Sequence, residues 1–206
     1  MKNGLYWFEH DLRISDNPAL TQLARSVDNL VCVYCFSVAD IRETYFTHEP
    51  LGPHRYRFLH EAIAELRQSL AQYHVELVVL YGEPVDVISK FITDNDITHV
   101  AKHYHTGYRE NERLTLLKAK HPDVKFSEAN AYTLYNLADL PMSLAELPDV
   151  FTPFRKKVEK QSTPRKPISA PSYLPATLDD KKAVYQTLDA ANMAALPSVS
   201  PVFENS

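Results

Sequence analysis

Five short apolar segments recur along the first 130 residues, each separated from the next by a dozen or more residues of mostly helical pattern. Connections of this length join parallel strands, with the intervening helix lying against the sheet. We therefore predict an α/β domain over residues 1–135, built on a five-stranded doubly wound parallel sheet with right-handed crossovers and strand order 3-2-1-4-5. The predicted strands are residues 5–8, 30–36, 76–81, 97–101 and 124–126.

Helix signals occupy the intervals between these strands. Asn17 and Pro18 supply an N-cap and a proline at the first helical position, and Gly52-Pro53 opens a longer helix. Apolar residues at helical spacing predict two more helices, around residues 85–92 and 110–120. The arrangement is Rossmann-like. Residues 136–206 are predicted to form an extension and linker, with short helices at 150–160 and 178–195.

Glycine and proline divide the chain into two parts. There are only 4 glycines, all at or before Gly107, whereas 9 of the 14 prolines lie in the last 66 residues. The glycine positions exclude both G-x-G-x-x-G and the P-loop pattern. The irregular proline spacing is typical of a stiff linker.

Charge and hydropathy narrow the class of protein. A net charge of −4 argues against a generically basic nucleic-acid coat. No run approaches the 18 or so apolar residues that cross a membrane, and the first apolar run is too short for a signal peptide. With 2 cysteines, a disulfide-stapled secreted fold is not expected. We expect a cytoplasmic, monomeric protein without membrane contact.

Two motifs invite a chemical interpretation. Cys32 and Cys35 form a C-x-x-C, but inside a strand these positions point to opposite faces, so packing is favoured over redox chemistry. His99, His103 and His105 lie in or just after the fourth strand, where a metal site would need convergent ligands. The sequence offers no acid obviously placed to complete such a set. A ring of histidines at the carboxyl edge of the sheet is therefore favoured, and no metal is expected.

Two polar clusters follow strands that the predicted order makes neighbours. The first cluster is Asp11, Arg13, Asp16 and Asn17, and the second is residues 110–113 (ENER). Each is alone compatible with a solvated loop or a helix N-terminus. At a shared switch point, where the chain leaves neighbouring strands in opposite directions, both would rim one ligand crevice.

Residues 155–166 carry six basic side chains and one acidic side chain. This basic segment is compatible with contact to phosphate, with a solvated helix face, or with an acidic neighbouring domain.

Several motifs together resemble the photolyase/cryptochrome family. Residues 7–20 (WFEHDLRISDNPAL) are similar to its opening signature, residues 51–59 (LGPHRYRFL) to its second landmark, and residues 150–156 (VFTPFRK) to its V-F-T-x-F-x-K segment. Residues 132–135 (YTLY), 139–141 (DLP) and 147–149 (LPD) are most similar to the DASH cryptochrome branch. Glu9 departs from the pattern, which usually has arginine there, and so changes the charge of the first loop.

This resemblance implies an N-terminal antenna domain. In such proteins a larger helical C-terminal domain, which has no counterpart in these 206 residues, holds FAD and the DNA lesion. Light-driven electron transfer from reduced flavin then splits a cyclobutane pyrimidine dimer, and methenyltetrahydrofolate commonly serves as antenna. The fragment alone is expected to be inactive, with no catalytic residue of its own, and its partners would be that domain and, through it, DNA.

The resemblance also implies candidate folate contacts. Asn111 and Glu112 correspond to the Asn and Glu of an N-E-R motif that contacts the pterin, and His48 corresponds to a folate-contacting histidine, with a spacing that differs by one. Phe8 and Phe36 are inferred from position to wall the pocket. The alternative function is a stand-alone nucleotide-binding module of the same shape, which the shortage of glycine disfavours. A hydrolase or transferase has little support because no nucleophile–base pair stands out.

Overall fold

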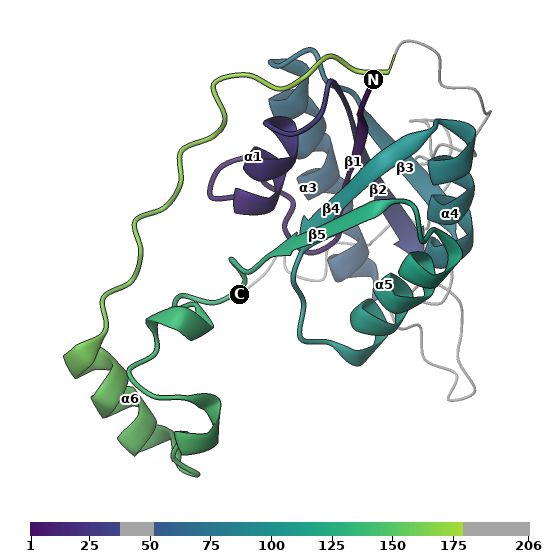
Figure 1. The fold of residues 1–206 in the computed structure, drawn as a ribbon. Coiled ribbons are helices and arrows are strands. Elements are labelled where there is room, and N and C mark those ends of the chain that lie inside the picture. The colour runs from purple at the N-terminus through teal and green to yellow at the C-terminus, as the bar shows by residue number, and fades with distance from the viewer. Residues whose placement is uncertain (38–51, 179–206) are drawn as a thin grey trace.

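The computed structural model describes residues 1–37 and 52–178 (Figure 1). Its sheet is parallel throughout and has the order β3-β2-β1-β4-β5, which confirms the predicted topology. Each strand lies within about three residues of its predicted bounds at either end. The strands are β1 (Asn3–Phe8), β2 (Asn29–Ser37), β3 (Leu77–Gly82), β4 (Ile97–His103) and β5 (Lys125–Ala129).

Helices cover both faces of the sheet, as predicted. Figure 1 shows α1 and α3 on one face and α4 and α5 on the other. Three of these helices begin with proline at the first turn, where its missing N–H costs no hydrogen bond. The helices of the domain are α1 (Pro18–Ala24), α3 (Pro53–Ala71), α4 (Pro84–Asp94) and α5 (Tyr108–Lys120). None of the described helices is long and apolar enough to cross a bilayer.

The central strand divides the hydrophobic core into two halves. Tyr6 and Phe8 of β1 pack in the cluster under α1 and α3, whereas Leu5 and Trp7 pack in the cluster under α4. All four side chains are buried, because a strand between two helical layers contributes alternate residues to each layer. An apolar side chain of this size stabilises the fold by about 1.5–3 kcal/mol when it is fully buried.

The C-x-x-C pair behaves as the strand geometry predicts. Cys32 is buried in the α1/α3 core and Cys35 packs against the opposite core. Burial raises the pKa of the Cys32 thiol well above its ordinary value, so the reactive thiolate form is disfavoured.

The segment after β5 first leaves the domain and then returns to it. It forms two short 3₁₀ turns, η1 (Leu137–Asp139) and η2 (Leu144–Glu146), and the helix α6 (Phe151–Gln161), which stand apart from the sheet (Figure 1). Helix α6 confirms the predicted helix at 150–160, whereas the helix predicted at 178–195 lies, except for its first residue, outside the described residues.

The returning strap, residues 163–178, is bonded to the domain. The Asp16 N–H donates to the carbonyl of Ile168 at 2.7 Å, and the Leu30 N–H donates to the carbonyl of Ala176 at 2.9 Å. Leu174 is buried in the α1/α3 core. This part of the proline-rich extension is therefore packed on the α/β domain.

His99 lies away from the carboxyl edge, in the first half of β4. Its Nδ1 lies 3.3 Å from Ser26 Oγ and its Nε2 lies 2.9 Å from Ser127 Oγ, so the ring connects the end of α1 to β5. Only 7% of the residue is exposed. Burial, and secondarily the charge of Lys125, lowers the pKa of His99 below its ordinary value of 6.5.

We predict that stability falls on acidification and that His99→Gln reduces this fall. Since the folded-state pKa is the lower one, the unfolded chain binds more protons below about pH 6.5, and stability is lost from there down to the folded-state pKa. The contribution of one group to the slope is at most about 1.4 kcal/mol per pH unit. Urea unfolding between about pH 7 and pH 5 measures it.

The matched control is His74→Asn. His74 is exposed and has a φ of 58°, a conformation that asparagine tolerates. An equal reduction of the slope in the control, or none in His99→Gln, would show that burial of His99 is not the cause.

Candidate functional site

The carboxyl ends of β1 and β2 and the first turns of α5 surround a cavity of about 160 Å³. Strand β1 and its exit contribute Trp7 and Glu9, strand β2 contributes Tyr34, and helix α5 contributes Glu110 and Arg113. Because β1 lies between β2 and β4, the chain leaves neighbouring strands in opposite directions here. This is the switch point at which open α/β sheets bind their ligands.

Glu9, one of the residues that line this crevice, belongs to a buried ion pair. Lys102 on β4 contacts the carboxylate of Glu9, and its Nζ lies 4.7 Å from the centre of the Trp7 ring. The Lys102 residue is 1% exposed and the Glu9 side chain 11% exposed. Burial raises the pKa of Glu9, while the charge of Lys102 acts in the opposite direction and favours the carboxylate. Lys102 thus neutralises the acid that departs from the family pattern at position 9.

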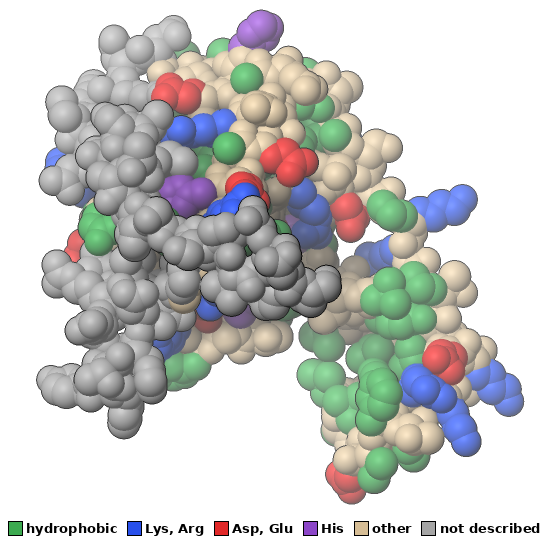
Figure 2. Space-filling view, turned by 180° about the vertical axis from the view of Figure 1, so that it is seen from behind, with side chains coloured by type: hydrophobic (Ala, Val, Ile, Leu, Met, Phe, Trp, Pro, Cys, Tyr) green, Lys and Arg blue, Asp and Glu red, His purple; other side chains and the backbone are tan. Residues whose placement is uncertain are grey.

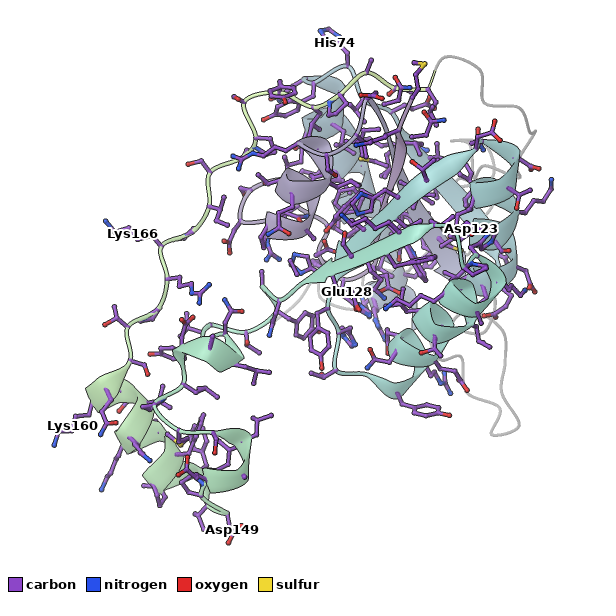
Figure 3. All side chains as sticks on the ribbon, in the orientation of Figure 1. His74, Asp123, Glu128, Asp149, Lys160 and Lys166 are labelled. Carbon is purple, nitrogen blue, oxygen red and sulfur yellow. The ribbon has the colours of Figure 1, made fainter. Side chains whose placement is uncertain are left out.

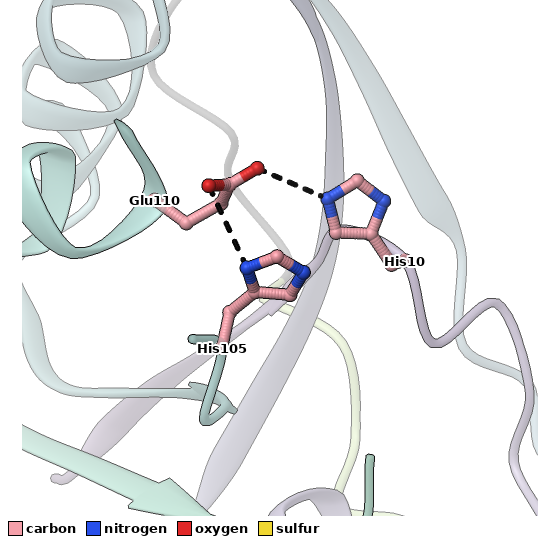
Figure 4. A group of neighbouring side chains, drawn as sticks. All are labelled: His10, His105 and Glu110. Atoms are coloured by element: carbon pink, nitrogen blue, oxygen red, sulfur yellow. Dashed lines mark hydrogen bonds and ion pairs between the residues drawn. The ribbon is translucent and has the colours of Figure 1, made fainter. Parts of the chain in front are cut away.

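A second polar group lies at the rim. His10 Nε2 is 3.3 Å from Glu110 Oε1, and His105 Nδ1 is 3.5 Å from Glu110 Oε2 (Figure 4). Burial lowers the pKa of His105, although Glu110 acts against it. Burial alone would raise the pKa of Glu110, but a hydrogen bond from its own backbone N–H, together with His10 and His105, lowers it overall. At neutral pH the group therefore carries a carboxylate beside a neutral His105.

Residues of the first polar cluster build the loop after β1. The Tyr6 hydroxyl donates to Asp11 Oδ2 at 2.5 Å, and Asn17 Nδ2 donates to the same oxygen at 3.2 Å. Asn17 Oδ1 in turn accepts from the Leu20 N–H at 3.0 Å, which confirms the predicted N-cap. Both Asp11 and Asn17 are buried. The structure corrects the expectation that the whole cluster rims the crevice, because the polar groups of Asp11 and Asn17 are hydrogen-bonded inside the loop.

Arg13 and Asp16 also serve the loop and its neighbours. Arg13 Nη2 donates to the Asp16 carbonyl at 3.2 Å and to the Ala131 carbonyl at 3.3 Å. Asp16 Oδ1 accepts the Ile168 N–H at 3.1 Å. These two residues join the loop to the returning strap and to the exit of β5, which gives them a structural role.

The three histidines in and just after β4 do not form one ring, contrary to the expectation. His99 lies in the first half of the strand, and His103 is buried with its Nε2 3.8 Å from Asp11 Oδ2. Burial lowers the pKa of His103, although Asp11 acts in the opposite direction. Of the three, His105 is the one that meets Glu110, which lines the crevice and is the acid that the sequence did not indicate as its partner.

The predicted folate contacts lie in different places. Asn111 and Glu112 are in the first turns of α5, where Asn111 Nδ2 donates to the Gly107 carbonyl at 2.9 Å. The exposed Glu112 accepts a hydrogen bond from the Tyr108 hydroxyl at 3.2 Å. Their neighbour Arg113 donates to Ser37 Oγ at 3.0 Å, so the N-E-R sequence adjoins the end of β2.

The aromatic candidates are core residues. Phe8 is 0% exposed and Phe36 is 3% exposed, and both belong to the core under α1 and α3. Helix α5 covers the other face (Figure 1), so the structure does not bring these rings together with Asn111 and Glu112. His48 lies outside the described residues.

Sequence reasoning missed Lys102, the buried partner of Glu9, and His10, which lines the crevice. A lysine inside an otherwise buried strand was the available signal for Lys102, because an unpaired buried ammonium is costly. His10 is the second residue after β1, within the opening signature, and its side chain is 41% exposed.

The comparisons with known proteins agree with this architecture. The model of the DNA photolyase family matches residues 4–172. The chain belongs to this family. A cryptochrome DASH from Idiomarina loihiensis is 34% identical over 159 residues, which cover 77% of this chain and 35% of that protein.

Solved members of the family share the fold. The crystal structure of a Synechocystis sp. PCC6803 cryptochrome superposes with a TM-score of 0.81 at 28% identity, over 87% of this chain and 38% of that one. An archaeal photolyase from Sulfolobus tokodaii, described as holding two FAD molecules, has the same fold at a TM-score of 0.71 and 18% identity, over 85% of this chain and 38% of that one. The chain thus spans about a third of the length of the curated relatives it matches.

We predict that Lys102→Met destabilises the domain by about 3–5 kcal/mol, because it leaves the Glu9 carboxylate buried without its partner. The double variant Glu9→Gln, Lys102→Met should recover most of this loss, since neither charge is then buried. Urea unfolding of the single and double variants measures the coupling. A double variant as unstable as Lys102→Met would contradict the paired role.

Proposed function

We propose that this chain is the antenna-chromophore domain of a light-dependent photolyase or DASH-type cryptochrome and binds methenyltetrahydrofolate at the crevice. The observation that carries the proposal is the position of the N-E-R sequence, residues 111–113. Arg113 connects it to Ser37 at the carboxyl end of β2, beside the switch-point cavity. Ser37 is also the last described residue before the segment that contains His48.

The chemistry of these side chains suits a pterin. The Glu112 carboxylate is exposed and can accept two parallel N–H bonds from an amino-pyrimidine edge. Asn111 is oriented by its bond to the Gly107 carbonyl, at the start of the same helix. His48 is proposed as the third contact. Phe8 and Phe36 are proposed to contribute by holding the ends of β1 and β2 in place.

The partner domain is the second part of the proposal. A C-terminal domain that binds FAD would receive the excitation energy and use it to repair cyclobutane pyrimidine dimers in DNA. The lobe around α6 offers a surface for such a domain, because apolar side chains gather there beside lysines and arginines (Figure 2). Its exposed apolar residues are Leu134, Leu137, Leu144, Leu147, Val150 and Phe151.

A stand-alone nucleotide-binding module is the second candidate function. The switch-point crevice itself favours it, as the site where nucleotides bind in other open α/β sheets. Thermal-shift measurements with adenine nucleotides, FAD and folates separate the two. Stabilisation by nucleotides alone supports the module, whereas stabilisation by folate supports the antenna. FAD is included as an alternative chromophore.

We predict that methenyltetrahydrofolate added to this chain gives a red-shifted absorption band. The same measurement is repeated with the flavin domain supplied in trans. Glu112→Gln should weaken binding roughly tenfold to a hundredfold, the equivalent of about 1.5–3 kcal/mol for hydrogen bonds to a charged group. Absorption titration measures the affinity.

The control for this titration is Asp123→Asn. Asp123 precedes β5, at the amino edge of the sheet, and is exposed (Figure 3). Absence of any red shift, with and without the flavin domain, would refute the antenna proposal. An equal loss in both variants would refute the role of Glu112.

We predict that charge reversal in the basic segment weakens DNA binding by the full-length protein. Lys160 and Lys166 point away from the domain (Figure 3), and so are free to face a phosphate backbone. The double variant Lys160→Glu, Lys166→Glu should lower affinity for damaged DNA and reduce its salt dependence. Fluorescence anisotropy at several salt concentrations measures both. An unchanged salt slope would assign the segment to another role.

A further inference from the structure

Three side chains from separate segments converge at the rim of the crevice. His10 follows β1, His105 follows β4 and Glu110 lies in the first turn of α5 (Figure 4). One donor atom from each lies within 4.8 Å of the other two. Among the described residues this is the group of histidine, cysteine and acidic side chains whose donors are close enough to share a metal ion.

The hydrogen bond at His105 fixes the tautomer that metal binding at Nδ1 requires. The Gly107 N–H donates to His105 Nδ1 at 2.9 Å, and a backbone N–H is only a donor, so Nδ1 carries a lone pair rather than a proton. Glu110 Oε2 nevertheless lies 3.5 Å from this nitrogen. Two acceptors thus face one another, and a positive ion that took the Nδ1 lone pair in place of the Gly107 N–H would interact favourably with both.

Gly107 keeps the space for this approach open. A Cβ at this position would lie 2.1 Å from Glu110 Oε2 and 2.7 Å from His105 Nδ1, closer than atoms can approach without moving. The φ of Gly107 is −67°, which any residue adopts, so the requirement for glycine is steric. Because Gly107 has no side chain, Glu110 Oε2 and His105 Nδ1 can both lie next to this position.

We propose that His10, His105 and Glu110 form a binding site for a divalent transition-metal ion, with Zn²⁺ as the fitting species. Zinc takes imidazole nitrogen and carboxylate oxygen at roughly 2.0–2.2 Å, and two ligands of a tetrahedral ion at such distances lie about 3.3 Å apart. The observed separations from Glu110 are 3.3 Å to His10 and 3.5 Å to His105. Two histidines and one carboxylate also form a donor set that leaves a fourth position open.

Two of the neighbouring positive groups are already paired with acids. Lys102, whose charge acts on His105, contacts Glu9, and Arg113 lies 3.9 Å from Glu83. Arg55 and Arg109 also line the cavity. The side chain of His10 is 41% exposed, which leaves a path for the ion and for a water in the fourth position. The ion would join the exits of β1 and β4 to α5 across the switch point. The site uses neither Asn111 nor Glu112, so its ligands differ from the proposed folate contacts.

Calorimetric titration of the metal-stripped 206-residue chain with Zn²⁺ tests the proposal. One ion per chain is expected, together with a rise in the thermal midpoint, because an ion that binds only the folded state stabilises it. His10→Ala and Glu110→Gln should each lower affinity by more than tenfold. Gly107→Ala removes no ligand but should lower affinity roughly tenfold to a hundredfold by displacing two.

His74→Asn is the control, since it removes an exposed imidazole at the opposite end of the domain (Figure 3). Circular dichroism verifies that each variant is folded. Tetrahedral Co²⁺ absorption and its loss in Glu110→Gln would support the site directly. Absence of Zn²⁺ binding, affinity unchanged in both His10→Ala and Glu110→Gln, or an equal loss in His74→Asn would overturn the proposal.

Discussion

The burial of β1 on both faces is the constraint on which the rest of the structure depends. Its side chains alternate between two helical layers, and its backbone bonds to β2 on one side and to β4 on the other. A strand in this position has no solvent edge, so the polar groups at its carboxyl end meet those that follow β4. The crevice, the ion pair of Glu9 with Lys102 and the histidines beside Glu110 all follow from this position.

The loop after β1 shows how a family signature acts physically. Asp11 and Asn17 look like ligand-binding residues in the sequence, because polar side chains after a strand often face a ligand. In the structure their oxygens accept from Tyr6 and from the start of α1, inside the protein. A buried carboxylate is costly unless it is hydrogen-bonded, so once Asp11 is buried its partners must be supplied by the loop itself.

Predictions of strands, caps and strand order agree with the structure, whereas side-chain pairings between distant segments could not be read from the sequence. The strands, the strand order, the cap at Asn17 and the opposite faces of Cys32 and Cys35 are all read from spacing and residue type. The pairing of Glu9 with Lys102 joins residues 93 positions apart, and neither residue indicates its partner. The placement of the candidate folate residues as contacts stays a prediction.

The sequence by itself determined the α/β class and the order of the elements, because periodicity and capping are local properties of the chain. It also carried the motifs that are characteristic of the photolyase family. Only the tertiary structure decided which polar groups face the crevice. His99, His103 and His105 look equivalent along the chain, yet one connects α1 to β5, one is buried beside Asp11 and one meets Glu110. The reason is physical: strand direction, loop path and the start of α5 together orient each ring, and none of these is encoded at the histidine itself.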